Sequence, residues 1–275
     1  MKSLGSSTGR TTRLARSALV IAVCALLGAE PSPAVGQAQT GAAILVYHRF
    51  GPIAGSTTVS DAGLDQQLSW LSSNAHAAPL RSVIDALRAG KTTAGRPCVA
   101  ITADDGHSSI YTDLYPRILR YRVPITLFIY PSAISNASYA LTWSQLTEMA
   151  GSGLVDVQSH TYWHPNFQQE KTRRSAPDYR EFVDMQLARS KEVLEAHIGR
   201  PVDMLAWPFA VHDQELDAAA VRAGYSIGFV LGNRAARPNT DMLALPRFWV
   251  SDSDRPARLA AMLASAACPL DMEDR

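Results

Sequence analysis

Short apolar runs alternate along this chain with segments in which apolar residues recur at helical spacing. Runs rich in Val, Ile, Leu and aromatic residues are typical of buried strands, and recurrence at every third or fourth position is typical of amphipathic helices. We therefore expect strands at residues 43–47, 99–102, 125–130, 154–158, 204–207, 225–230 and 245–250. We expect helices at residues 64–71, 83–87, 108–121, 142–150, 178–198, 213–223 and 256–267.

The alternation of strand and helix from residue 43 onward indicates parallel strands joined by crossover helices, and hence the α/β class. No internal repeat, low-complexity linker or block of charge divides residues 37–275, so a single domain is the simplest organisation. About seven strand–helix units favour a (β/α) barrel over a short open sheet. An open, doubly wound sheet is the alternative.

The first 36 residues differ from the rest of the chain. Basic residues up to Arg16 precede an apolar stretch at residues 18–29, and prolines and small residues follow it. This order is typical of a secretory signal peptide, and the stretch is short for a membrane span. We predict a signal peptide at residues 1–36 and export to the periplasm or the extracellular space. An uncleaved anchor, with loose membrane association, is the alternative.

Charge and cysteine content narrow the choice of partners. The chain holds 26 basic and 25 acidic residues, and residues 1–36 contain four of the former and one of the latter. The remainder is slightly acidic and has no basic stripe, which argues against nucleic acid as a partner. Cys98 and Cys268 remain after residue 36, and an exported protein is compatible with either a disulfide or two buried thiols. The sequence does not indicate an oligomeric state.

Polar and aromatic side chains follow several expected strands at the point where each strand ends. These residues are His48, Asp104, Asp105, His160 and the segment at residues 207–209. In a parallel barrel the carboxyl ends of all strands open on one face, so side chains from separate strands converge there. The pattern therefore predicts a polar pocket at that face.

The two adjacent aspartates need an explanation, because neighbouring anions at a buried strand end repel each other and lose hydration. An Asp–Gly turn is the purely structural interpretation of Asp104, Asp105 and Gly106. His160 and His164 lie four residues apart, and on one helical turn both rings would lie on the same side. With one aspartate they would form a His₂–Asp metal site with open coordination positions, and the other aspartate could stay ionised as a base.

Three motifs resemble those of a known family. Residues 102–106, Thr-Ala-Asp-Asp-Gly, resemble the Thr-Phe-Asp-Asp-Gly motif of the NodB-homology polysaccharide deacetylases, carbohydrate esterase family four. Residues 159–164, Ser-His-Thr-Tyr-Trp-His, are similar to the His-Ser/Thr-x-x-His metal motif of that family. Residues 207–210 lie where the family has its third motif. Segments at residues 46–48, 223–225 and 245–247 resemble the branch that deacetylates poly-N-acetylglucosamine.

The resemblance implies a distorted (β/α) barrel with seven or eight parallel strands, and it also implies roles. Asp105, His160 and His164 would bind one divalent metal ion, with zinc as the default and nickel, cobalt or iron as alternatives. Asp104 would be the general base, and a backbone N–H near Phe209 would help to stabilise the oxyanion. The implied reaction is removal of N-acetyl groups from an amino-sugar polysaccharide. Poly-N-acetylglucosamine, peptidoglycan and chitin oligomers all fit as substrates.

Two departures from the family pattern affect these roles. No arginine precedes Trp207, where many members have one that orients the base, and Arg247 is the candidate substitute. The Leu-x-His motif that supplies the general acid is missing. His48 is therefore the candidate acid or substrate contact, ahead of His212 and Asp213.

Nearby aromatic residues have two interpretations. Ala103 replaces the usual aromatic residue of the first motif, which would open the floor of the pocket. Trp163, Phe167 and Trp249, together with Trp207, could supply apolar surface against sugar rings. Ordinary core packing is the other explanation for each of them.

Two other functions compete with deacetylation. A barrel glycosidase would pair Asp104 with a second carboxylate, but adjacent carboxylates diverge and cannot easily flank one glycosidic bond. That function would also leave the histidines unexplained. A non-catalytic glycan-binding module on the same fold is the alternative that the missing acid motif favours.

Overall fold

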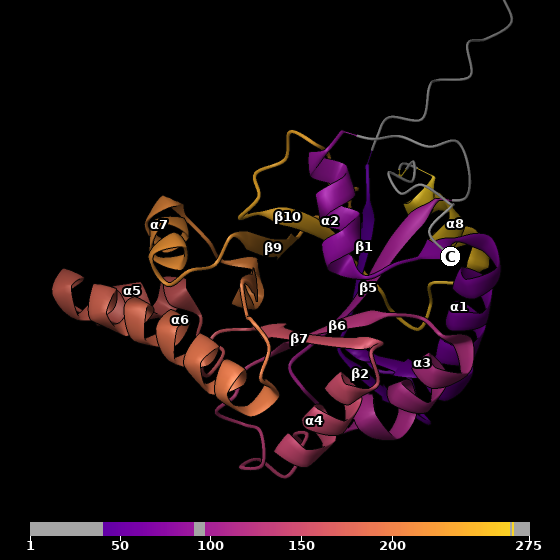
Figure 1. Cartoon of the computed structure of the whole chain (residues 1–275), viewed down its shortest axis with the longest axis horizontal. Coiled ribbons are helices and arrows are strands. Elements are labelled where there is room, and N and C mark those ends of the chain that lie inside the picture. Colours follow the sequence, from indigo (N-terminus) through magenta and orange to yellow (C-terminus); the bar gives the residue numbers. More distant parts are fainter. Residues whose placement is uncertain (1–40, 91–96, 265, 267–275) are drawn as a thin grey trace, which may run out of the picture. The chain divides into compact units, whose positions relative to one another are not determined.

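The computed structural model describes residues 41–90, 97–264 and 266 of the chain. Seven parallel strands form a closed barrel in the order β1-β10-β9-β8-β7-β6-β5, which β5 closes by pairing with β1 (Figure 1). The predicted barrel of seven or eight parallel strands is confirmed. The barrel strands are β1 Ala43–Tyr47, β5 Cys98–Asp104, β6 Ile125–Ile129, β7 Val155–Ser159, β8 Met204–Ala206, β9 Ile227–Leu231 and β10 Leu245–Trp249.

Helices connect these strands on the outside of the barrel. α6 packs against α5 and α7, and these three helices lie together on the left in Figure 1. On the other side, α1 packs against α3 and α8. The helices are α1 Asp61–Asn74, α2 Leu80–Arg88, α3 Tyr115–Tyr121, α4 Trp143–Gly151, α5 Phe167–Arg173, α6 Ala176–Ile198, α7 Gln214–Arg222 and α8 Pro256–Leu263.

Several short elements were not expected from the sequence. β2 Arg49–Gly51 and β3 Thr58–Ser60 form a small two-stranded sheet after β1, and β4 His76–Ala77 pairs with the start of β5. The helix expected at residues 108–121 is present, but it begins as a π-helical turn, η1 Ile110–Leu114, before α3. Segments of this length contain too few residues for hydrophobic periodicity to show.

Alternate residues of each strand point into the barrel, as the two-residue period of a strand requires. The interior is apolar at the amino ends of the strands, where α2 packs against it. This cluster includes Ile44, Leu80, Val83, Ile84, Leu87, Ala100, Phe128, Met204, Phe229 and Leu245. The same alternation brings polar residues inward at the carboxyl ends, where the site lies.

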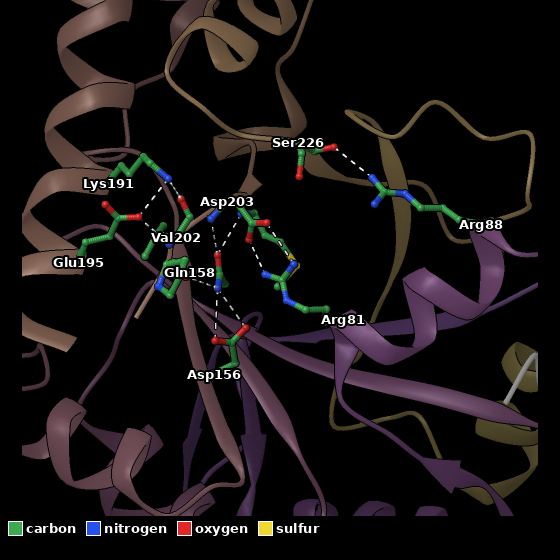
Figure 2. A network of polar contacts seen from close by, with 11 residues as sticks. Arg81, Arg88, Asp156, Gln158, Lys191, Glu195, Val202, Asp203 and Ser226 are labelled. Carbon is green, nitrogen blue, oxygen red and sulfur yellow. Dashed lines mark hydrogen bonds and ion pairs between the residues drawn. The ribbon is translucent and has the colours of Figure 1, made fainter. Parts of the chain in front are cut away.

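The backbones of β7 and β8 pair over a short distance, with the single register pair of Ser159 and Leu205. The Gln158 side chain strengthens this junction, as Figure 2 shows. Its Oε1 accepts hydrogen bonds from the backbone N–H of Asp203 at 3.1 Å and of Met204 at 3.0 Å. Its Nε2 donates to the Asp156 carboxylate at 3.1 Å.

Replacing Gln158 by Ala should lower the free energy of unfolding by about 2–4 kcal/mol, since the backbone N–H groups of the buried Met204 and the half-buried Asp203 would lose their acceptor. Gln158 is only 1% exposed, so water could not easily replace the amide. Urea denaturation would measure the change, with the exposed Gln168→Ala as a control. A loss below about 0.5 kcal/mol would mean that Gln158 does not hold β7 and β8 together.

Two predictions fall on residues outside those the structure describes. The signal peptide at residues 1–36 is one, and the pairing of Cys98 with Cys268 is the other, because Cys268 is not among the described residues. Within residues 41–90, 97–264 and 266, no helix is long and apolar enough to cross a membrane.

Candidate active site

The structure brings the predicted polar residues together at the carboxyl ends of the strands. Asp104 lies four residues after Ala100, and Arg247 lies two residues after Leu245, both of which pack inside the barrel. Because the strand period is two, Asp104 and Arg247 point to the same interior. The site is therefore assembled from strands that are far apart in sequence but neighbours in the barrel.

Arg247 and Asp104 form a buried, two-pronged ion pair. Arg247 Nη1 donates to Asp104 Oδ1 and Nη2 donates to Oδ2, both at 2.7 Å. Burial by itself raises the pKa of the Asp104 carboxyl, but the charge of Arg247, aided by His160 and by the hydrogen bonds from Arg247, outweighs it and brings the pKa to about 2. Asp104 is therefore ionised at neutral pH, and the guanidinium fixes the direction of its carboxylate.

Asp105, His160 and His164 meet beside this pair. The Nε2 atoms of His160 and His164 each lie 3.6 Å from Asp105 Oδ1. The three ligand atoms that these residues offer all lie within 4.8 Å of one another. Two imidazole nitrogens and one carboxylate oxygen at this spacing match a His₂–Asp set for a divalent ion.

The protonation of the histidines supports this match. His160 Nδ1 lies 2.7 Å from the carbonyl oxygen of Ala206, to which it donates, so the Nε2 lone pair faces Asp105. Burial lowers the pKa of His160 to about 3 and also lowers the pKa of His164. The neutral His160 ring thus directs a lone pair at a carboxylate oxygen, an arrangement that is unfavourable unless a cation lies between them. The donor set therefore fits a bound divalent metal.

The two histidines do not lie on a helical turn, so that expectation was wrong. Thr161 has a φ of 64° and His164 a φ of 62°, and these left-handed residues form a loop instead. Asp105 is also left-handed, with a φ of 75°. Such a conformation costs a non-glycine residue about 1–3 kcal/mol, and it concentrates where function requires it.

A pocket of about 250 Å³ opens above these groups. The His48 ring packs against Trp249 with 4.2 Å between ring centroids, and Phe209 packs against His164 at 4.7 Å. The lining residues are His48, Thr57, Asp104, Asp105, His160, His164, Trp207, Phe209, Ala210, Leu231, Arg247 and Trp249.

His48 is the remaining titratable group of the pocket. Its Nδ1 is buried and has no hydrogen-bond partner among the described residues. Burial lowers the pKa of His48, while the charges of Asp104 and Asp105 act in the opposite direction. The resting ring is therefore neutral.

Not every aromatic residue expected at the site contributes a surface for substrate. Phe167 is completely buried and packs against Phe182 and Trp207, so ordinary core packing is the correct one of its two interpretations. Trp207 lines the pocket wall, but its indole N–H donates to the Leu243 carbonyl at 2.9 Å. Trp163 is 41% exposed but does not line the pocket.

The two weaker candidates for the acid are engaged elsewhere. His212 Nδ1 lies 3.5 Å from the Asp217 carboxylate. Asp213 caps α7 by accepting from the Leu216 N–H at 2.9 Å, and it pairs with Lys171 at 3.2 Å. Neither His212 nor Asp213 lines the pocket.

Sequence reasoning missed two lining residues, Thr57 and Leu231, and it placed Ala210 in the third motif without giving it a role. Thr57 precedes the short strand β3, which carries no periodic signal. Leu231 is an ordinary apolar residue of a type found throughout the core.

Comparison with known proteins agrees with this geometry. The sequence profile of the family described as polysaccharide deacetylase matches residues 91–228, half of the chain. The chain therefore belongs to the polysaccharide deacetylase family, and the resemblance read from its motifs is confirmed. The prediction that it is an enzyme of this class is confirmed with it.

Among similar proteins, the poly-beta-1,6-N-acetyl-D-glucosamine N-deacetylase of Staphylococcus aureus is 24% identical over 200 residues, covering 71% of this chain and 68% of that protein. The structure of IcaB from Ammonifex degensii is similar with a TM-score of 0.69 and 25% identity, covering 82% of this chain and 98% of that one. The Streptococcus pyogenes deacetylase PplD, solved in complex with acetate, shares the fold with a TM-score of 0.73 at 21% identity. That match covers 82% of this chain and 99% of PplD.

Proposed function

We propose that this chain is a metal-dependent hydrolase that removes N-acetyl groups from an amino-sugar polysaccharide, either poly-N-acetylglucosamine or a related cell-envelope glycan. The observation that carries the proposal is the convergence of Asp105, His160 and His164 beside the buried pair of Asp104 and Arg247. The similarity to a Staphylococcus aureus enzyme named for poly-beta-1,6-N-acetyl-D-glucosamine supports this class of substrate.

Asp105, His160 and His164 would hold one divalent ion, for which zinc is the first choice and nickel, cobalt or iron are alternatives. When bound, such an ion supplies Lewis acidity, which lowers the pKa of an attacking water and polarises the acetyl carbonyl. With only three protein ligands, such a site would keep coordination positions for water or substrate, as a catalytic rather than a structural site requires.

Asp104 takes the proton of the attacking water in this proposal. The charge of Arg247 keeps the carboxylate ionised and aimed, so Arg247 is a positioning residue rather than a catalytic one. A carboxyl group with a pKa of about 2 holds a proton only weakly. Asp104 therefore passes the proton on readily to the leaving amine or to His48.

The backbone near Phe209 would stabilise the oxyanion. Phe209 and Ala210 have φ values of 55° and 56°, so the chain after β8 turns sharply at the pocket. The Phe209 N–H has no acceptor among the described residues, and such a free backbone donor suits an oxyanion. The 59% exposed Phe209 ring adds apolar surface at the pocket rim.

His48 would act as the acid that protonates the leaving amine, on the opposite wall of the pocket. Its resting ring is neutral, so it must gain a proton during turnover before it can donate one. The carboxylates of Asp104 and Asp105 favour that uptake. Packing against Trp249 holds the ring in place for the transfer.

Arg247→Met should move the acid limb of the kcat/KM profile to higher pH by at least about one unit, because an arginine charge typically lowers a neighbouring carboxyl pKa by one to three units. The pKa of Asp104 is lowered in the folded protein. The active, ionised form of Asp104 is therefore present at a pH above this pKa, and it is lost as the pH falls below it. Arg247→Lys keeps a charge and should move the limb less. If the acid limb of the kcat/KM profile were unchanged in Arg247→Met, Arg247 would not be the residue that keeps Asp104 ionised.

The substrate is tested by measuring acetate release from poly-N-acetylglucosamine, peptidoglycan and chitin oligomers with defined metals added back. The proposal expects release from at least one of these polymers. Binding of a polymer without any release would instead favour the non-catalytic glycan-binding module.

We also propose that residues 1–36 are a signal peptide and that residues 37–275 form the exported deacetylase domain. The basic, apolar and small-residue order of the first 36 residues supports this. Mass spectrometry of the protein recovered from the exporting cell should show cleavage near residue 36. A full-length chain in the membrane fraction would instead support the uncleaved anchor.

A further inference from the structure

Helix α6 packs against β7 with a buried face that is not wholly apolar. Gln186 and Ser190 are completely buried on this face, and they lie four residues apart, so they occupy one side of the helix. A buried polar side chain destabilises the fold unless it is hydrogen-bonded, and an apolar residue of similar size carries no such cost. The other buried residues of the helix are Tyr179, Phe182, Val183, Leu187 and Leu194.

Gln186 holds the backbone of the segment between the two proposed histidine ligands. Its Oε1 accepts a hydrogen bond from the Trp163 N–H at 3.0 Å. A backbone N–H needs an acceptor, so the amide oxygen of Gln186 rather than its Nε2 faces this group. Trp163 immediately precedes His164, and the hydrogen bond therefore fixes the backbone one residue before the second histidine.

Ser190 reaches the same segment through Ser159. The two hydroxyl oxygens lie 2.8 Å apart, and both side chains are completely buried. Ser159 Oγ also accepts from the Thr161 N–H at 3.1 Å. Thr161 in turn holds His164, because its Oγ1 accepts from the His164 N–H at 3.2 Å. α6 therefore supports the segment at two points, one just after His160 and one just before His164.

The segment needs this support because its backbone is strained. Thr161 and His164 are left-handed, with φ values of 64° and 62°. Such conformations persist in residues other than glycine only when the surrounding structure enforces them. The hydrogen bonds from Gln186 and through Ser190 come from a helix outside the segment, so they can supply that constraint.

We propose that Gln186 and Ser190 are positioning residues, which keep His164 aimed at the metal site from α6. Neither side chain lines the pocket. Their loss would let the segment between the histidines relax, so that His164 Nε2 would no longer be held 3.6 Å from Asp105 Oδ1. This inference rests on the proposed metal site and deepens it.

The test measures the dissociation constant of zinc in the purified protein, by competition with a chromophoric chelator. Gln186→Met removes the acceptor at nearly constant size and should weaken zinc binding about three- to tenfold, as expected for the loss of one hydrogen bond. Gln186→Glu keeps an oxygen acceptor for the Trp163 N–H and should restore most of the affinity. Ser190→Ala should weaken zinc binding by a similar factor, and Ser190→Thr, which keeps the hydroxyl, should weaken it less.

Two controls separate positioning from general destabilisation. Gln67 is a completely buried glutamine of α1, and its Nε2 donates to the carbonyls of Ser251 and Asp254, neither of which is a proposed ligand. Gln67→Met should leave the zinc affinity unchanged even if it lowers Tm, because a protein that stays folded keeps its site. In His164→Ala, titrated at higher zinc concentrations, adding Gln186→Met should weaken binding no further, since the ligand through which Gln186 acts is gone.

Three results would overturn the inference. One is an unchanged zinc affinity in both Gln186→Met and Ser190→Ala, and another is an equal loss of affinity in Gln67→Met. The third is an undiminished effect of Gln186→Met in the His164→Ala background. Ser190→Ala is a small change, so it still decides the matter if Gln186→Met does not fold.

The failure of this inference can be told apart from the failure of the proposed function. If the wild type binds zinc and the variants bind it equally well, only the role of α6 is removed. If the wild type binds no divalent ion, the proposed metal site and the role of α6 are removed together.

Discussion

Replacing Asp104 by Asn should lower acetate release about a hundred- to ten-thousandfold, the usual contribution of a general base, while the metal stays bound. The amide cannot accept the water proton, but Asp105, His160 and His164 are unchanged. Asn is close in size to Asp and can still accept one hydrogen bond from Arg247. The loss should therefore appear in kcat rather than in metal content.

The same substitution should also reduce stability. Arg247 is only 2% exposed, and Asp104→Asn removes the charge that compensates it. Leaving a buried charge unpaired costs about 3–5 kcal/mol, so the kinetic assay must be run well below the unfolding transition of the variant. Asp65→Asn is a suitable control, because Asp65 also pairs with an arginine, Arg117, but lies on α1. Full activity of Asp104→Asn would remove Asp104 as the base.

His160→Ala should lose both the metal and the activity. Removing one of the three proposed protein ligands should weaken metal binding by more than about a hundredfold. The reason is that loss of a residue that only hydrogen-bonds to a ligand already weakens metal binding about ten- to a hundredfold. Metal analysis of the dialysed protein would measure the loss, and acetate release should fall below detection. Added zinc should not restore the variant at concentrations that saturate the wild type.

The His160→Ala variant needs a control for folding, because His160 is buried and its Nδ1 donates to Ala206. His164→Ala provides one, since His164 is a more exposed member of the proposed ligand set and this variant should lose metal in the same way. His197→Ala, on the exposed end of α6, should retain full metal content. Full metal occupancy in both His160→Ala and His164→Ala would contradict the ligand assignment.

The barrel could be predicted because each of its strands leaves a local signal. Apolar runs such as residues 43–47 and 125–130 are flanked by helical segments and can be recognised without tertiary information. β2, β3 and β4 could not be predicted, because each has only two or three residues and depends on a neighbouring segment for its hydrogen bonds.

Part of the site could also be predicted from local signals in the sequence. Asp104, Asp105 and His160 follow strands directly, and the carboxyl ends of parallel strands must share one face. Arg247 was identified only as a substitute for a missing arginine, yet its place on β10 brings it within hydrogen-bond distance of Asp104. The resemblance to a known family supplied the roles of these residues, which their spacing in the sequence does not indicate.

Other features depend on contacts that the sequence does not reveal. Thr161 and His164 adopt left-handed conformations that neither residue type suggests, and so the loop between the histidines was mistaken for a helical turn. Phe167 and Trp163 are aromatic residues near the same motif, but α5 buries Phe167 against Phe182 whereas Trp163 remains exposed.

Metal-dependent hydrolysis is tested most directly by one measurement, acetate release from an N-acetylglucosamine polymer before chelation, after chelation and after return of a divalent ion. We expect the purified protein to release acetate, to lose that activity with the chelator and to regain it with the ion, while His160→Ala does not. Release that persists undiminished in the fully chelated protein would contradict a metal-dependent mechanism at Asp105, His160 and His164.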